Sequence, residues 1–117
     1  METFLDVKGI NSNTLYARFV SMKESPRYVS VCLVVNAGLK DDDNYSDSGT
    51  RIRDKMLYSE GYGLITTMHP RDALHTAERT AIISALNMLK LDYTHNRKAQ
   101  EIIKLLKKLL KSEVLTW

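Results

Sequence analysis

Short apolar segments, rich in β-branched and aromatic residues and separated by polar runs, fill the first third of the chain. This pattern is typical of β-strands that are joined by turns. The polar run 8–13 predicts the first turn, and Ser25-Pro26 predicts the second. The last segment is apolar almost throughout, which predicts a central strand that is covered on both faces. The predicted strands of this part are 3–7, 14–20 and 27–35.

Two further segments, 51–59 and 62–68, lie on either side of the dipeptide Glu60-Gly61. Because Gly is a strong turn signal, we interpret the pair as a β-hairpin. The alternative for the first segment is a helix over 49–59 that ends at Gly61.

The last third of the chain has helical periodicity. Pro70 and Asp72 favour a helix start, apolar residues recur at helical spacing to about Leu91, and 92–96 breaks the pattern. A second helix is predicted over 97–112, where the apolar residues form one stripe opposite a row of lysines. This stripe either closes the core or forms the interface of a homo-oligomer. Its residues are Ala99, Ile102, Ile103, Leu105, Leu106, Leu109 and Leu110.

These elements predict the α+β class. We expect one domain over residues 1–117, with an N-terminal antiparallel sheet of about four to five strands followed by two C-terminal helices. A chain of this length is large enough for a single core. The homo-oligomer, if formed, is expected to use the helix 97–112.

Composition narrows the possible functions. The net charge of +3 comes from the C-terminal 23 residues, which carry six Lys/Arg and two Asp/Glu, whereas 36–50 is acidic and is predicted to be a surface loop. Cys32 is the one cysteine, so no disulfide framework or multi-cysteine metal site is available. We find neither a signal peptide nor an apolar run long enough for a membrane span, and we expect a cytoplasmic protein that binds no membrane.

Glu78 is the main physical anomaly of the first predicted helix. Its neighbours on the same helical face are all apolar: Leu74, Ala81, Ile82 and Ala85. A buried carboxylate needs a partner, because its removal from water is costly. We expect Arg18, Arg51 or Arg53 to pair with it, or Glu78 to lie at the rim of the sheet.

The segment AERTAIISAL, residues 77–86, resembles the active-site helix of zinc cytidine deaminases, in which the glutamate transfers protons. In that family a Cys or His two positions before the Glu, and a later Pro-Cys-x-x-Cys, bind the zinc. Here Thr76 stands at the first of these positions and no cysteine follows Glu78. His75 lies one position earlier and is expected to face elsewhere on the helix. We therefore expect no deaminase activity.

VCLVVNAG, EGYGLITT and HTAERTAIISALNML occur in an order that resembles ribonuclease-H-like domains. The resemblance implies that Glu78 is a ligand in a two-metal site. Asn36 stands where that family has an aspartate at the end of its first strand, and two-metal hydrolysis needs several carboxylates. We expect no metal, no cofactor and no catalytic residue, so a degenerate relative of this family is an alternative to a pure binding protein.

Arg51 and Arg53 are two residues apart, and in a strand they project on the same side. Paired guanidinium groups bind phosphates or carboxylates through bidentate hydrogen bonds. Tyr45, Tyr58 and Tyr62 are near in sequence and suit stacking on a base. These residues predict a site for an anionic, nucleotide-like ligand; alternatively, the two arginines neutralise the acidic segment 41–47 or meet Glu78.

In its layout the chain resembles the phage anti-Thoeris sponges, short proteins that sequester cyclic nucleotide immune signals and place a sheet before two helices. The resemblance implies a nucleotide ligand and an anti-defence role. We expect Arg51, Arg53 and Arg79 to contact phosphates, Tyr62 to stack on the base, and Glu78 to orient an arginine or a ribose hydroxyl. Nucleic acid is a less favoured partner. A protein-binding inhibitor that docks through Leu105 and Leu109 of the last helix is a further alternative.

Overall fold

The fold is that of a computed structural model, which describes residues 5–11, 16–36, 51–53, 56–92, 97–111 and 115–116. The strands are β1 (Leu5–Asn11), β2 (Tyr16–Glu24), β3 (Tyr28–Asn36), β4 (Arg51–Arg53), β5 (Met56–Leu64) and β6 (Leu115–Thr116). The helices are α1 (Pro70–Asp92) and α2 (Arg97–Leu110). All the strand pairs are antiparallel, and the order in the sheet is β4-β5-β3-β2-β1-β6.

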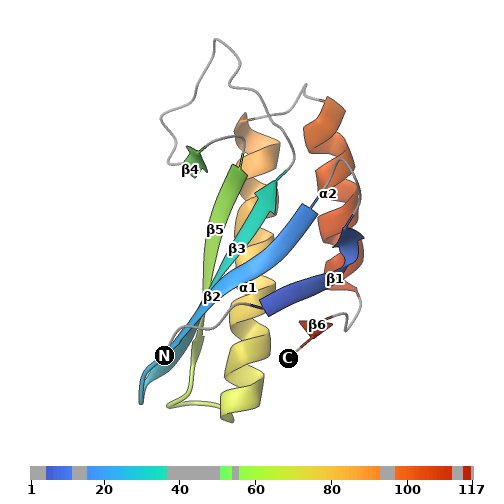
Figure 1. Cartoon of the computed structure of the whole chain (residues 1–117). Helices are drawn as coiled ribbons and strands as arrows, with labels where there is room; N and C mark the ends of the chain where they lie inside the picture. Colours follow the sequence, from blue (N-terminus) through green and yellow to red (C-terminus); the bar gives the residue numbers. More distant parts are fainter. Residues whose placement is uncertain are drawn as a thin grey trace.

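Both helices pack on the same face of the sheet, α1 behind β5 and β3 and α2 toward β1 (Figure 1). The predicted α+β class, with an antiparallel sheet followed by two helices, is therefore confirmed. The predicted four to five strands are too few, because the described part of the chain contains six. The unpredicted strand β6 has two residues and comes after the helices, where it pairs with β1. A two-residue strand carries no periodicity from which it can be predicted.

The turn between β2 and β3 forms where Ser25-Pro26 predicted it. The backbone N–H of Ser25 donates to the carbonyl of Tyr28 at 2.9 Å, and the Ser25 hydroxyl accepts from the N–H groups of Arg27 and Tyr28 at 3.2 Å each. β2 runs to Glu24, four residues beyond the predicted end. The cause is a register shift between Phe19 and Ser21, which interrupts the alternation of apolar and polar positions.

The prediction of a hairpin turn at Glu60-Gly61 is wrong, and so is the alternative helix over 49–59. Residues 56–64 form one continuous strand, which pairs with β3 along its whole length. Gly61 faces α1, and a Cβ at this position would overlap the carbonyl oxygen of Ala77. The glycine therefore permits close packing of a helix on a strand and does not mark a turn.

Alanines at every fourth position of α1 form the matching surface: Ala73, Ala77, Ala81 and Ala85, each fully buried. A Cβ on Gly63 would overlap the carbonyl of Ala73, one turn before Ala77. Between the glycines and Leu57, the buried Ser59 hydroxyl donates to the carbonyl of Ala81 at 2.7 Å. Small residues on both elements thus bring the backbones of α1 and β5 unusually close.

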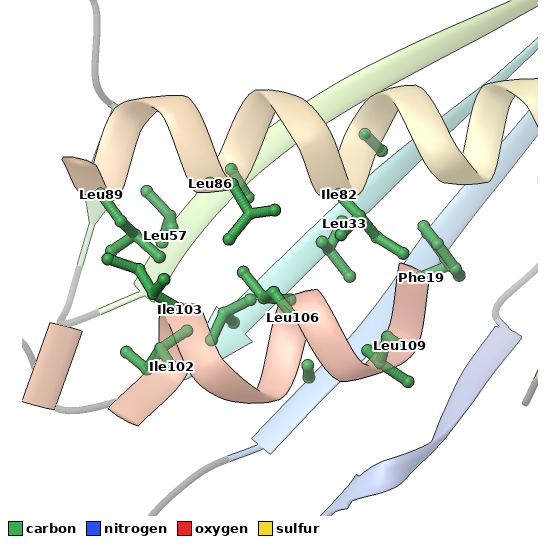
Figure 2. Close-up of a cluster of buried hydrophobic side chains, with 14 of the residues drawn as sticks. Phe19, Leu33, Leu57, Ile82, Leu86, Leu89, Ile102, Ile103, Leu106 and Leu109 are labelled. Carbon is green, nitrogen blue, oxygen red and sulfur yellow. The ribbon is translucent and has the colours of Figure 1, made fainter. Parts of the chain in front are cut away.

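The apolar stripe of α2 closes the other half of the core. Ile102, Leu106 and Leu109 are buried, and the side chains of this cluster lie between α1 and the sheet residues Phe19 and Leu33 (Figure 2). Leu105 and Leu110 are partly buried against the same cluster. The exposed residues of α2 are polar: Arg97, Gln100, Glu101, Lys104, Lys107 and Lys108. Homo-oligomerisation through α2 stays a prediction, but the stripe that suggested it is covered within the chain.

Several predicted loops fall largely outside the described residues. Asn36 ends β3, and 37–50 is not described; likewise α1 ends at Asp92, before 93–96. The turn predicted at 8–13 begins too early, because β1 extends to Asn11. In the described part of the chain, neither helix is both long enough and apolar enough to cross a membrane.

Candidate functional site: the open face of the sheet

The two faces of β5 differ in what covers them. Leu57, Ser59 and the two glycines face α1 and are buried, while Glu60, Tyr62 and Leu64 lie on the opposite face and are exposed. Neither helix of the described chain covers this second face (Figure 1). We call it the open face. β3 is thus a central strand as predicted, but the helices cover it on one side alone.

The strand register arranges the open face in rows, because directly paired residues of antiparallel strands lie on the same face. One row contains Tyr62 on β5, Ser30 on β3 and Lys23 on β2. The next row contains Glu60, Cys32 and Ser21, and the following one contains Tyr58, Val34 and Arg18. In the last of these rows Val34 is buried, so the exposed aromatic, acidic and basic side chains gather in the first two rows.

Tyr62 is the most prominent side chain of the open face, with 55% of its surface exposed. Its ring makes an edge-to-face contact with Tyr28 of the neighbouring strand, with ring centroids 6.2 Å apart and ring planes at 62°. Its hydroxyl donates to Oε2 of Glu60 at 3.1 Å. These two contacts hold an exposed aromatic ring in place beside a carboxylate.

The backbone register places the two predicted arginines on the same face as Tyr62. Arg51 pairs with Tyr58 and Arg53 pairs with Met56, so both occupy open-face positions of the short strand β4. The predicted association of Arg51 and Arg53 with a tyrosine-bearing strand thus has a basis in the sheet. Tyr45, the third predicted tyrosine, lies outside the described residues.

Glu78 lies on the other side of the sheet, within α1. Its side chain is fully buried, and its Oε1 lies 3.3 Å from Nδ1 of His75. The expectation that His75 faces elsewhere is wrong, because residues three positions apart on a helix are neighbours. The predicted burial of Glu78 among apolar residues is confirmed, and one of its contacts is with His75, a residue that was not among its expected partners.

Arg79 also belongs to the helical side. Its guanidinium Nη1 donates to the backbone carbonyl of Leu110 at 2.8 Å. This carbonyl is one of the last of α2, whose acceptors have no partner within the helix itself. Arg79 thus connects the C-terminal end of α2 to α1, and neither Arg79 nor Glu78 shares a surface with Tyr62.

Sequence reasoning missed Tyr28, Lys23 and Glu60 as members of the site. The signal was present in 56–64, where a two-residue period puts Tyr58, Glu60 and Tyr62 on one face. The interpretation of Gly61 as a turn residue concealed it. Among the described residues, no group of three or more His, Cys, Asp or Glu is arranged to hold a metal ion.

No protein-family model, curated protein or solved structure matches this chain.

Proposed function

We propose that the protein is a non-enzymatic binding protein that holds an anionic, nucleotide-like ligand on the open face of its sheet. The observation that carries the proposal is the exposed ring of Tyr62, held by Tyr28 and in register with Lys23. Exposed aromatic residues on a sheet surface are a common platform for stacking nucleobases. Base–aromatic stacking contributes about 1–3 kcal/mol per base.

The charges around Tyr62 suit a phosphate. Lys23 is two strands away, which is about 10 Å at the usual spacing of strands, a separation that a nucleotide spans between base and phosphate. Farther along the face, beyond Glu60, β4 carries Arg51 opposite Tyr58 and Arg53 opposite Met56, and Tyr58 is about 14 Å along the strand from Tyr62. Arginine binds phosphate through bidentate hydrogen bonds, so we propose that Lys23 beside the tyrosine and the two arginines farther along the face offer cations to phosphate groups.

A protein that binds a nucleotide without converting it acts by sequestration or sensing. The resemblance of its layout to anti-Thoeris sponges, which the sequence suggested, favours sequestration of a nucleotide immune signal, as a phage anti-defence protein does. The site we propose consists of Tyr62, Arg51 and Arg53 from the predicted set, with Tyr28 and Lys23 in addition. Glu78 and Arg79 belong to the packing of the helices.

A thermal-shift panel of linear and cyclic nucleotides, each with and without magnesium, tests the proposal. A ligand at one hundred times its Kd stabilises the fold by about 2.7 kcal/mol, which gives a readily measured increase in Tm. We expect a magnesium-independent shift with one class of nucleotide, which Tyr62→Ala, Arg51→Ala and Arg53→Ala each abolish. Arg71→Ala, which removes an exposed arginine at the start of α1, is the matched control and should keep the shift.

If none of the nucleotides raises the Tm, the proposal is wrong. If the Tm shift persists in Tyr62→Ala, Arg51→Ala and Arg53→Ala, the protein binds a nucleotide, but at a site other than the open face.

A further inference from the structure

We infer that Glu60 determines the base preference of this site, and that it selects nucleobases that carry an amino group, guanine above all. The inference rests on the proposed function, because it assumes that a base stacks on Tyr62. It adds a class of ligand to that function: guanine, cytosine and adenine nucleotides rather than those of uracil or hypoxanthine.

The geometry that supports the inference is the position of the carboxylate at the tip of the tyrosine ring. The Tyr62 hydroxyl reaches Oε2 of Glu60 at 3.1 Å, and both side chains are exposed on the open face. A base stacked on the ring therefore extends one of its edges to within hydrogen-bonding reach of the same carboxylate. The hydrogen bond from Tyr62 also orients the carboxylate, which lowers the entropic cost of using it for recognition.

The chemistry of a carboxylate decides which nucleobases can form hydrogen bonds with it. An ionised carboxylate is an acceptor alone, with about four lone-pair sites on its two oxygens. Guanine offers two neighbouring donors, N1–H and the 2-amino group, and cytosine and adenine each offer one amino group. Uracil presents carbonyl oxygens on both sides of its single N–H, and these repel the carboxylate. The carboxylate thus favours guanine most and uracil least.

The same carboxylate fixes the direction in which the ligand lies. A phosphate over Glu60 would suffer repulsion between like charges, so the phosphate must lie on another part of the open face. Lys23, in the same row as Tyr62, offers a cation away from Glu60, whereas the β4 arginines opposite Tyr58 and Met56 lie beyond Glu60. The base edge therefore points to Glu60 while the phosphate points away from it.

Titration calorimetry with two pairs of nucleotides tests the inference, because the members of each pair differ in an amino group of the base. The pairs are GMP against IMP, which lacks the 2-amino group, and CMP against UMP, which has a carbonyl oxygen in place of the amino group. We expect the wild-type protein to bind GMP roughly tenfold or more tightly than IMP, as a good bidentate base contact discriminates, and to bind CMP more tightly than UMP through its single amino group. Glu60→Gln should reduce both ratios to within about threefold, since an amide both donates and accepts. Glu24→Gln, an exposed acid at the end of β2 in register with the buried Val29, is the matched control and should leave both ratios unchanged.

The possible failures are distinguishable. Similar affinities of the wild-type protein for all four nucleotides, or ratios that persist in Glu60→Gln, would overturn the role of Glu60 and leave nucleotide binding intact. Absence of binding by all four at millimolar concentration would overturn the role of Glu60 together with the site on which it rests. Unfolding curves of both variants establish that they are folded.

Discussion

Nδ1 of His75 lies 3.3 Å from Oε1 of Glu78, although 42% of the histidine side chain is exposed and the glutamate is fully buried. The pair connects the surface of α1 to its packed side within one helical turn. A carboxylate that is removed from water needs polar partners, and the imidazole supplies one while it keeps contact with solvent. The pair therefore contributes to the tolerance of an acid beside Ala81 and Ile82 in the core.

We predict that His75 and Glu78 are energetically coupled. His75→Ala should lower the free energy of unfolding by about 1–3 kcal/mol, because it removes one partner of a buried polar group. In a Glu78→Leu background the same substitution should cost less than about 0.5 kcal/mol, since a buried leucine has no need of an imidazole. Urea unfolding of the four proteins measures the coupling. Equal costs in the two backgrounds would contradict it, and Arg71→Ala on the same helix should be additive with Glu78→Leu.

A second prediction follows from the packing of α1 on β5. Gly61→Ala should lower the free energy of unfolding by about 3 kcal/mol or more, because the added methyl group meets the backbone of Ala77, which cannot rotate away. Leu64→Ala, at an exposed position of the same strand, should change it by less than about 1 kcal/mol. Thermal or urea unfolding measures both. A Gly61→Ala protein as stable as the wild type would mean that the backbones are farther apart than the structure shows.

Gly61 also shows why the fold was only partly predictable. Periodicity over ten or more residues identified both helices, and short apolar runs identified β2 and β3, because each signal extends over several neighbouring residues. A single glycine carries less information, since a tight turn and a close approach of two backbones require the same absent side chain. The alanines at every fourth position of α1 favour a close approach of two backbones, because they offer a surface of small residues that matches the glycines of β5.

The candidate site was predictable to a similar extent. The position of Arg51 and Arg53 on a strand next to β5 follows from local sequence, but the register pairs them with Tyr58 and Met56 and not with Tyr62, so their place in one site stays a prediction. Glu78 and Arg79 are separated from the open face because α1, which carries them, packs on the opposite face of the sheet. That is a property of the tertiary arrangement, and it follows from the buried Ser59 and the two glycines of β5.

Arg79 should act in stability and not in ligand binding. Arg79→Ala should lower the free energy of unfolding by about 0.5–1.5 kcal/mol, through loss of the hydrogen bond to the Leu110 carbonyl, and should increase amide hydrogen exchange in the last turn of α2. The nucleotide-induced thermal shift should be the same as in the wild-type protein. Loss of that shift in Arg79→Ala would instead mean that Arg79 contacts the ligand, as the sequence suggested.

The role of α2 is decided by the side chains of its apolar stripe. Leu106 is fully buried between α1 and the sheet, so Leu106→Ala should lower the free energy of unfolding by about 2–5 kcal/mol. Lys107→Ala, at the next and exposed position, should change it by about 0.5 kcal/mol or less. Unfolding measured at two protein concentrations, one hundredfold apart, separates core packing from subunit contact. Because packing within one chain is independent of concentration, the cost of Leu106→Ala should be the same at both, whereas a cost that grows with concentration would mean that this leucine also stabilises an oligomer.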